Sequence, residues 1–479
     1  MLNLNSKQID KYFFGAAILI FVFMHLHFIN APPNGYHQWR ESDTSAIIFN
    51  FYQEDANILQ QRCNQRGAGS GITGGELPTY SYLSATLYFL FGAHHFLPRL
   101  LTLVGSLVAL FYFRKSVELL TDDKNGKTAD YATIALAFSP VFLFYSYKIM
   151  PDIWMLMFMS MSVFYFLKGA ESRKLTQIAA SSLLLILSAS IKPLSLCLLV
   201  PYLFYLFHKN FGAMRAIVTI GVYGSVTLTL VAGWYIYGVY LNSIHQSEAF
   251  YMGDLILQSP EYLMKSEFYK KLFLQWPFEL WIGWALLPAF IWGALKFRQE
   301  RYGQFVLSWI VGCYIVFAIV AAHAGSHDYY TLIIVPPIAM ISGRGLYLLS
   351  LKPKWKVPLL IFLLTVLPAV SFLRISSRFT DIEEFDLMRQ SAKQHIDINA
   401  LVIVDESTSA IRLYQLNRKG WAYRDEITSV KIKPLIARGG EYLLLRKPIG
   451  EYGEAMSLLV QDSVIRFGPL YGYKTINRD

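Results

Sequence analysis

Long apolar stretches recur along most of this chain, separated by shorter polar segments. A helix that crosses the ~30 Å hydrocarbon core of a bilayer needs about 20 apolar residues. Windows that meet or approach this length lie near residues 12–30, 97–113, 129–147, 153–167, 216–240, 277–295, 303–322, 329–350 and 357–373. The pattern therefore predicts a polytopic α-helical membrane protein.

The apolar stretch 176–207 differs from the others in length. It is too long for one helix across the bilayer and short for two. Pro193 follows Lys192 inside this stretch, and a proline in a helix interior breaks the helix. We therefore expect two short helices that meet at Lys192, and about eleven transmembrane helices in total.

The aromatic segment 78–92, PTYSYLSATLYFLFG, is short and alternates polar with aromatic positions. Basic residues gather in cytoplasmic loops, so the positions of Lys and Arg along the chain indicate whether this segment spans the membrane. If it lies along the interface, the basic loops and the N-terminus share the cytoplasmic side, and if it spans, the loops all turn outward. These loops contain Arg114, Lys115, Lys124 and Lys127; Lys168, Arg173 and Lys174; Lys296, Arg298 and Arg301; and Lys352, Lys354 and Lys356. We therefore interpret the segment as an interfacial helix.

This topology places a defined set of segments on the outer face: residues 31–96, 148–152, Lys192, 242–276, 323–328 and everything after 374. In the tail, the runs ALVIV (400–404) and EYLLLR (441–446) alternate with helical stretches near 382–395, 407–416 and 451–460. Such alternation predicts a small α/β domain. We therefore expect a transmembrane domain over 1–373, with a periplasmic loop and interfacial helices at 31–96, and a soluble extracytoplasmic domain over 374–479.

Composition agrees with a membrane protein, since 54% of residues are hydrophobic and 16% are charged, against roughly 25% charged in soluble domains. The net charge of +10 falls on the basic loops and does not indicate nucleic-acid binding. Cys63, Cys197 and Cys313 do not form a disulfide framework. Lys7 and Lys11 precede the first apolar stretch, which we interpret as an uncleaved helix.

Charged residues gather near the predicted outer membrane surface, where polar groups are expensive unless they are paired or used. They come from five parts of the chain: Arg40, Glu41, Asp43, Glu76, Arg99, Lys148, Asp152, Lys192, His327 and Asp328. Each one alone has an ordinary structural explanation, such as an interfacial anchor for Lys148 or a helix cap for Asp152 or Asp43. Together they favour an amphipathic substrate, and a lipid-linked phosphate places its tail in the bilayer and its phosphate at this depth.

Transfer of a sugar from a polyprenyl phosphate needs one base, because the phosphate is already a good leaving group. A carboxylate deprotonates or orients the acceptor hydroxyl, while cations stabilise the charge that grows on the phosphate. Asp43 is the candidate base, and Arg99, Lys148 and Lys192 are the candidates for the phosphate. A divalent metal could share the latter task.

Several blocks of this sequence resemble the polytopic glycosyltransferases of the GT-C fold, in the branch of the protein O-mannosyltransferases and the lipid A aminoarabinose transferase. The blocks follow the family's order: RESDTSAIIFNFYQED (40–55), GELPTYSYLSATLYFLFG (75–92), LPRLLTLVGSLVALFYF (97–113), FSPVFLFYSYKIMPDIWMLMF (138–158), LSASIKPLSLCLLVPYLF (187–204) and GSHDYYTLIIVPPIAMISGRGL (325–346). The resemblance implies a GT-C-like membrane domain and a bacterial inner-membrane enzyme with its active site on the periplasmic face.

The resemblance also implies roles for particular residues. Asp43 matches the catalytic aspartate, with Glu41 as the alternative carboxylate of the same loop. Glu76 matches the glutamate near the donor phosphate or its metal, and Glu76 and His327 are the conceivable metal ligands. The remaining charged residues are candidates for substrate binding: Arg40, Arg99, Lys148, Asp152, Lys192, His327 and Asp328.

The leading hypothesis is therefore an inverting glycosyltransferase that moves a monosaccharide from a polyprenyl phosphate to a lipid, glycan or protein acceptor. A transporter or flippase of lipid-linked sugars is the alternative, and its polar groups would line a path at the bilayer midplane. Apart from the break at Lys192, the charges here concentrate at one face, which favours the enzyme. A scaffold without catalysis would leave the grouping of Asp43, Glu76 and the cations unexplained.

Overall fold

The computed structural model describes residues 6–121, 126–209, 212–247, 258–297, 302–379, 383–406, 411–423 and 427–476, with side chains described from Tyr12 onward except that of Glu383. Lys124, Arg298, Arg301, the first residues of the helix predicted near 407–416 and part of the loop 242–276 lie outside these ranges. The side chains of Lys7 and Lys11 are also outside them. The chain forms two compact units. Unit 1 comprises Met1–Ile29, Arg99–Trp234 and Met252–Ser377, and unit 2 comprises Asn30–Pro98, Tyr235–Tyr251 and Arg378–Asp479.

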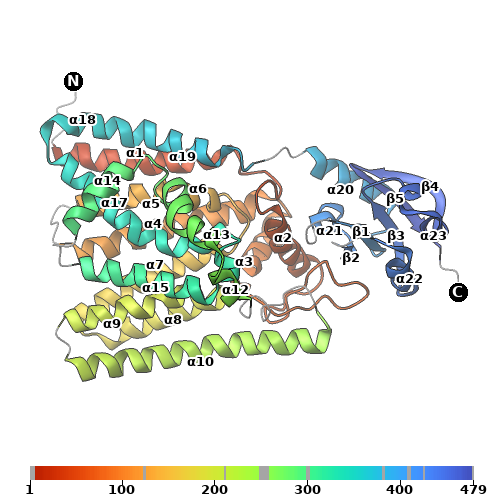
Figure 1. Cartoon of the computed structure of the whole chain (residues 1–479), viewed down its shortest axis with the longest axis horizontal. Helices are drawn as coiled ribbons and strands as arrows, with labels where there is room; N and C mark the ends of the chain where they lie inside the picture. Colours follow the sequence, from red (N-terminus) through yellow and green to blue (C-terminus); the bar gives the residue numbers. More distant parts are fainter. Residues whose placement is uncertain are drawn as a thin grey trace. The chain divides into compact units, whose positions relative to one another are not determined.

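Unit 1 is helical, as the apolar windows predict (Figure 1). Its first half contains α1 Ser6–Leu26, α4 Phe96–Leu120, α5 Lys127–Ala137, α6 Pro140–Tyr145, α7 Asp152–Ser172, α8 Leu175–Ile191, η1 Pro193–Leu198, α9 Leu199–His208 and most of α10 Ala213–His245. Its second half contains α12 Ser259–Leu263, α13 Ser266–Tyr269, η2 Lys270–Gln275, η3 Pro277–Trp281, α14 Leu287–Phe297, α15 Gly303–Ile319, α16 Ala321–Ala324, η4 Asp328–Ile334, α17 Val335–Ser350, α18 Pro353–Ile361, η5 Phe362–Val366 and α19 Leu367–Ser376.

Five helical stretches in the described part of the chain are long and apolar enough to cross a membrane. They are Phe96–Leu120, Asp152–Ser172, Ala213–His245, Asp328–Ser350 and Pro353–Ser376. Shorter apolar helices are Tyr12–Leu26, Leu175–Ile191, Pro193–His208, Leu287–Phe297 and Gly303–Ile319. The multi-pass architecture is therefore confirmed, while the predicted count of eleven spans is not.

Two predicted spans are interrupted in the structure. The window 129–147 divides into α5 and α6 because Pro140 starts a new helix after Ser139, whose backbone is extended. The window 277–295 begins as the π-helical turn η3, and positive φ angles at Gly283 and Trp284 separate it from α14. The break predicted at Lys192 is confirmed, since α8 ends there in extended backbone and Pro193 begins η1.

In unit 2, α2 Gln38–Gln53 and α3 Thr79–Phe91 carry most of the predicted outer loop. The aromatic segment is a helix of 13 residues, which is too short to cross a ~30 Å core at 1.5 Å per residue. That α3 lies along the membrane interface stays a prediction.

The tail contains α20 Glu383–His395, β1 Leu401–Asp405, α21 Ile411–Leu416, β2 Lys419–Tyr423, α22 Ser429–Ala437, β3 Gly440–Leu445, η6 Ile449–Tyr452, α23 Glu454–Ser457, β4 Val460–Phe467 and β5 Leu470–Thr475. Its sheet has the order β2-β1-β3-β5-β4, with β1 parallel to β2 and β3 and the remaining pairs antiparallel. One apolar cluster around Val402 and Val404 and a second around Ile403 and Leu443 give the sheet a core on each face.

The α/β character of the tail is confirmed, and β1, β3 and α20 lie where the sequence predicts them. The helical stretch predicted near 451–460 is confirmed only in part, because it consists of the end of η6 and the four-residue helix α23, and β4 begins at Val460. Gly453, at φ 90°, separates the two turns. The structure also places residues 30–98, which we predicted as part of the membrane domain, in one compact unit with the tail.

Candidate active site

Six of the ten predicted site residues lie in unit 1, where several helices break: Arg99, Lys148, Asp152, Lys192, His327 and Asp328. In this unit η4 contacts α6, α7 and η1, and α7 contacts η1. These breaks place charged side chains next to irregular backbone inside an apolar bundle. Such an arrangement in a membrane protein marks a functional site more often than an anchor.

Lys192 and Asp152 form a buried ion pair, in which Lys192 Nζ donates to Asp152 Oδ1. Asp152 is the first residue of α7, where the helix dipole favours a negative charge. The exposed fractions of the two side chains are 5% and 0%, so the two charges depend on each other. The sequence predicted both residues in the site, and the structure brings them into contact.

Aromatic rings surround this ion pair. Lys192 Nζ lies 4.1 Å from the ring centroid of Tyr329 and 5.3 Å from that of Tyr330, both within cation–π range. The His327 ring stacks on Tyr329 with centroids 5.3 Å apart. Asp328 accepts a hydrogen bond from the Tyr145 hydroxyl.

Two further cations are buried in unit 1. Lys148 is fully buried, with Nζ 4.8 Å from the centroid of the Phe144 ring. Arg99, also buried, donates to the backbone carbonyl of Tyr147. Thr102 Oγ1 donates to the carbonyl of Lys148 at 3.0 Å, so α4 holds the turn between α6 and α7 from one side.

The other four predicted residues lie in unit 2, three of them on α2. Arg40 donates to Glu76 across the loop that joins α2 to α3. Glu41 is fully buried and its carboxylate accepts the backbone N–H of Asn34 at 3.2 Å. Asp43 is half-buried.

The charge of Asp43 acts on two other groups of unit 2. Burial raises the pKa of the Cys63 thiol to about 12, and the nearby negative charge of Asp43 contributes to this rise. Burial also raises the pKa of Glu406 to about 7, again with a contribution from Asp43. Asp43 therefore lies close to both a loop cysteine and a carboxylate of the tail.

Some residues of these arrangements were not predicted. Tyr145 and Tyr329 lie in two of the blocks that carry the family resemblance. Tyr145 is three residues before Lys148 and Tyr329 directly follows Asp328, so closeness in sequence to a predicted site residue could have identified both. Glu406 follows β1 in the tail, and no pattern in the sequence connects it with Asp43.

Glu76 and His327 are the predicted metal ligands. No group of three His, Cys, Asp or Glu side chains in the described ranges could hold a metal ion. Glu76 is paired with the Arg40 guanidinium, and His327, the other predicted ligand, belongs to unit 1. The metal at Glu76 and His327 therefore stays a prediction.

Known proteins resemble this chain in sequence over part of its length and in fold over nearly all of it. The family model of dolichyl-phosphate-mannose-protein mannosyltransferases matches residues 76–237, about a third of the chain. That stretch contains Glu76, Arg99, Lys148, Asp152 and Lys192. No curated protein sequence matches the chain.

Solved structures resemble the chain over nearly its whole length. ArnT from Cupriavidus metallidurans bound to undecaprenyl phosphate has a TM-score of 0.65 and 13% identity, with 96% of this chain and 98% of that chain covered. The oligosaccharyltransferase AglB from Archaeoglobus fulgidus, in complex with an inhibitory peptide and a dolichol-phosphate, has a TM-score of 0.61 and 10% identity, with 92% and 69% covered. The arabinofuranosyltransferase AftD from Mycobacteria has a TM-score of 0.56 and 13% identity, with 98% and 42% covered.

The fold therefore defines the class: this chain has the GT-C fold of polytopic membrane glycosyltransferases, and the resemblance predicted from its sequence is confirmed. The family model covers about a third of the chain and these structures are at most 13% identical to it, so the full-length likeness is one of fold.

Proposed function

We propose that this protein is a membrane glycosyltransferase that moves a monosaccharide from a polyprenyl phosphate to an acceptor on the periplasmic face of a bacterial inner membrane. The observation that carries this proposal is the set of buried cations at the helix breaks of unit 1, in a fold that binds undecaprenyl phosphate in ArnT. A soluble substrate would not require Lys148 and Lys192 inside an apolar helical bundle.

In this proposal, Lys192, Lys148 and Arg99 bind the donor phosphate. Charge-assisted hydrogen bonds from Lys and Arg to phosphate are strong, and they are stronger still where water is excluded. Asp152 holds the Lys192 ammonium in place through their ion pair, while the rings of Tyr329 and Tyr330 cover it. As the bond from the anomeric carbon to the phosphate oxygen breaks, these cations stabilise the negative charge that remains on the polyprenyl phosphate.

Asp43 is the proposed general base. The acceptor hydroxyl oxygen forms a bond to the anomeric carbon from the side opposite the phosphate, so the configuration inverts, and its proton passes to the Asp43 carboxylate. Glu41, the alternative, is fully buried and accepts the Asn34 N–H, whereas Asp43 is half-buried. This difference supports Asp43 as the base and Glu41 as a residue that supports the loop.

The acceptor in this proposal is a lipid, a growing glycan or a protein hydroxyl. A structure of the same fold illustrates the protein case, since the Archaeoglobus fulgidus oligosaccharyltransferase was solved tethered with an acceptor peptide. A divalent metal held by Glu76 could share the stabilisation of the phosphate charge, while the base and the cations named above are protein side chains.

The test incubates the purified full-length protein with a panel of polyprenyl-phosphate sugars and follows donor hydrolysis or transfer. Asp43→Asn should lower the rate by at least about 100-fold, the usual contribution of a general base, without lowering the yield of folded protein. Asp462→Asn is the matched control, because Asp462 is exposed on β4.

Full transfer by the Asp43→Asn variant would refute the assignment of the base. If the wild-type protein neither binds nor turns over any member of the panel, the proposed function itself is wrong.

A further inference from the structure

Residues 54–76, which we call the strap, connect α2 to α3 without a helix of their own. The strap begins directly after α2 ends at Gln53 and finishes at Glu76, the partner of Arg40. Segments of this length without regular structure are uncommon in compact domains and usually have a function. The strap also contacts the end of α10, where Asn242 accepts the N–H of Gly74, and three further sets of contacts join it to α2 and to the tail.

The first set joins the strap to α2. Asn50 Nδ2 donates to the carbonyl of Arg62 at 2.9 Å and to Asn64 Oδ1 at 3.0 Å. Asn50 lies seven residues after Asp43, so both side chains project from the same face of the helix. The strap therefore runs along the face of α2 that carries the proposed base.

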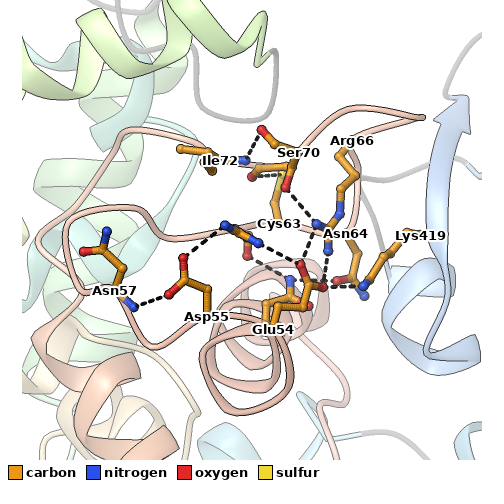
Figure 2. A network of polar contacts seen from close by, with 12 residues as sticks. Glu54, Asp55, Asn57, Cys63, Asn64, Arg66, Ser70, Ile72 and Lys419 are labelled. Atoms are coloured by element: carbon orange, nitrogen blue, oxygen red, sulfur yellow. Dashed lines mark hydrogen bonds and ion pairs between the residues drawn. The ribbon is translucent and has the colours of Figure 1, made fainter. Parts of the chain in front are cut away.

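The second set is an ion network centred on Glu54, in which Figure 2 shows Lys419 reaching the carboxylate from β2. Arg66 binds the same carboxylate with both terminal nitrogens, at 2.8 and 2.5 Å. Arg62 adds a longer contact of 3.5 Å to Glu54 and one of 3.1 Å to Asp55. Burial alone would raise the pKa of Glu54, but the hydrogen bonds from Arg66 and Lys419 outweigh it and lower that pKa to about 2.

The third set joins the strap backbone to β2, an edge strand of the tail's sheet. The N–H groups of Arg66 and Gly67 donate to the carbonyl of Gly420 at 3.1 and 2.8 Å, and Gly420 N–H donates to the carbonyl of Asn64 at 3.2 Å. A side chain at Gly67 would lie 2.5 Å from the indole nitrogen of Trp421, so the close approach requires glycine. The strap thus covers a sheet edge that would otherwise stay open.

We propose that the C-terminal domain positions α2, and with it Asp43, by holding the strap through Lys419 and Glu54. Lys419 and Glu54 are positioning residues, since they act on the reaction through α2 and not on the substrate. This inference rests on the proposed function for its kinetic test, while its structural test is independent of it.

The strength of the network follows from its burial. The exposed fraction is 6% for the Arg66 side chain and 16% for Glu54, so solvent screens their interaction only partly. Removing the Lys419 ammonium takes one of three cations from the carboxylate and loosens the tail from the strap, while the fold of the tail's own core is untouched.

The experiment compares Lys419→Ala, Lys419→Arg and the control Lys433→Ala in the full-length protein. Lys433 is an exposed lysine on α22 of the same domain. Hydrogen exchange of the α2 backbone (38–53) and of the strap is measured in each variant, together with kcat and the KM for a polyprenyl-phosphate sugar. We expect Lys419→Ala to speed exchange in both segments and to lower kcat by about tenfold, with an unchanged KM, because small misplacements of a catalytic group lower the rate steeply.

Lys419→Arg should restore both readouts, because it keeps the charge, and Lys433→Ala should match the wild type. Unchanged exchange in α2 and the strap of Lys419→Ala would overturn the proposal, and so would a raised KM with an unchanged kcat, which would make Lys419 a binding residue. If the wild-type protein transfers no sugar, the proposed function fails, and the exchange measurement still decides whether Lys419 positions α2.

Discussion

At the scale of single residues, Glu406 is the least expected charged group of unit 2. It directly follows β1, and 5% of its surface is exposed. Its carboxylate accepts the N–H of Arg412 at 2.8 Å, and the Arg412 side chain approaches within 4.0 Å. Burial, with the charge of Asp43 adding to it, raises the pKa of Glu406 from 4.5 to about 7. Glu406 is therefore largely protonated in mildly acidic solution.

The raised pKa of Glu406 predicts a pH-dependent stability. Between pH 4.5 and about 7 the folded protein holds a proton that the unfolded chain has lost, so this contribution to stability falls as the pH rises. The loss amounts to at most ~3 kcal/mol, at about 1.4 kcal/mol per pH unit. Glu406→Gln stays neutral, so its thermal midpoint should match the wild type at pH 5 and exceed it at pH 8.

Glu454→Gln, at an exposed position of α23, is the control and should change neither midpoint. An identical difference between Glu406→Gln and wild type at both pH values would mean that the carboxylate does not titrate in this range.

At this scale the sequence predicted some of the charged residues of the site and missed others. Lys192 and Asp152 were predictable because a buried charge beside a helix break in an apolar stretch is costly, and the resemblance named both positions. The proximity of Glu406 to Asp43 was not predictable, since it arises only when the tail folds against α2. The sequence around Asp43 does not indicate a contact with the tail, and the sequence around Glu406 does not indicate a contact with α2.

At the scale of elements, the crossing of α14, α17 and α5 depends on small residues. A Cβ atom on Gly345 would lie 1.8 Å from the carbonyl oxygen of Ala289, and one on Gly293 would lie 2.0 Å from that of Ile341. Gly343 of α17 packs against α5 in the same way, since a Cβ atom on it would lie 2.4 Å from the Cα of Ala132. Small residues let helix backbones approach closely within a membrane, where packing drives association.

Gly345→Ala should therefore destabilise unit 1, although alanine is the better helix former. The added methyl group would have to push the α14 and α17 backbones apart, and overpacking of this kind costs about 1–3 kcal/mol. Gly221→Ala on α10 is the matched control, since nothing lies within 4 Å of its added Cβ. Thermal unfolding in detergent should show a lower midpoint for Gly345→Ala only, and equal midpoints would refute the close crossing.

Helix positions were predictable at this scale, and helix breaks only in part. Apolar windows locate helices because burial in lipid requires them, and Pro193 marked its break in advance. The break at Gly283 and Trp284 is set by positive φ angles in an otherwise apolar window, which periodicity does not detect. The exposed strand β4 was missed because its solvent-facing residues hide the apolar alternation that identifies strands.

At the scale of the whole molecule, the division of the chain does not follow the order of the sequence. Unit 2 assembles residues 30–98, the end of α10 and the C-terminal tail. Asn242, near the end of α10, accepts the N–H of Gly74 at 2.7 Å, so the strap is tied to this helix as well as to the tail. Composition alone separated the tail from the membrane helices, because a soluble fold and a lipid-facing fold differ in polarity. It could not reveal that the tail and the outer loop fold together.

This assembly predicts how the strap responds when the tail is removed. A chain that ends at Ser377 lacks Lys419, Gly420 and Trp421, so the strap loses its ion partner and its backbone partner together. Trypsin should then cleave after Arg62 and Arg66 at least about tenfold faster than in the full-length protein, because proteolysis follows the population of the open backbone. Cleavage after Lys265, an exposed residue of unit 1 paired with Glu261, serves as the internal reference and should keep its rate. Equal cleavage of the strap in both chains would mean that α2 and α10 alone hold it, and the tail would then have no part in positioning Asp43.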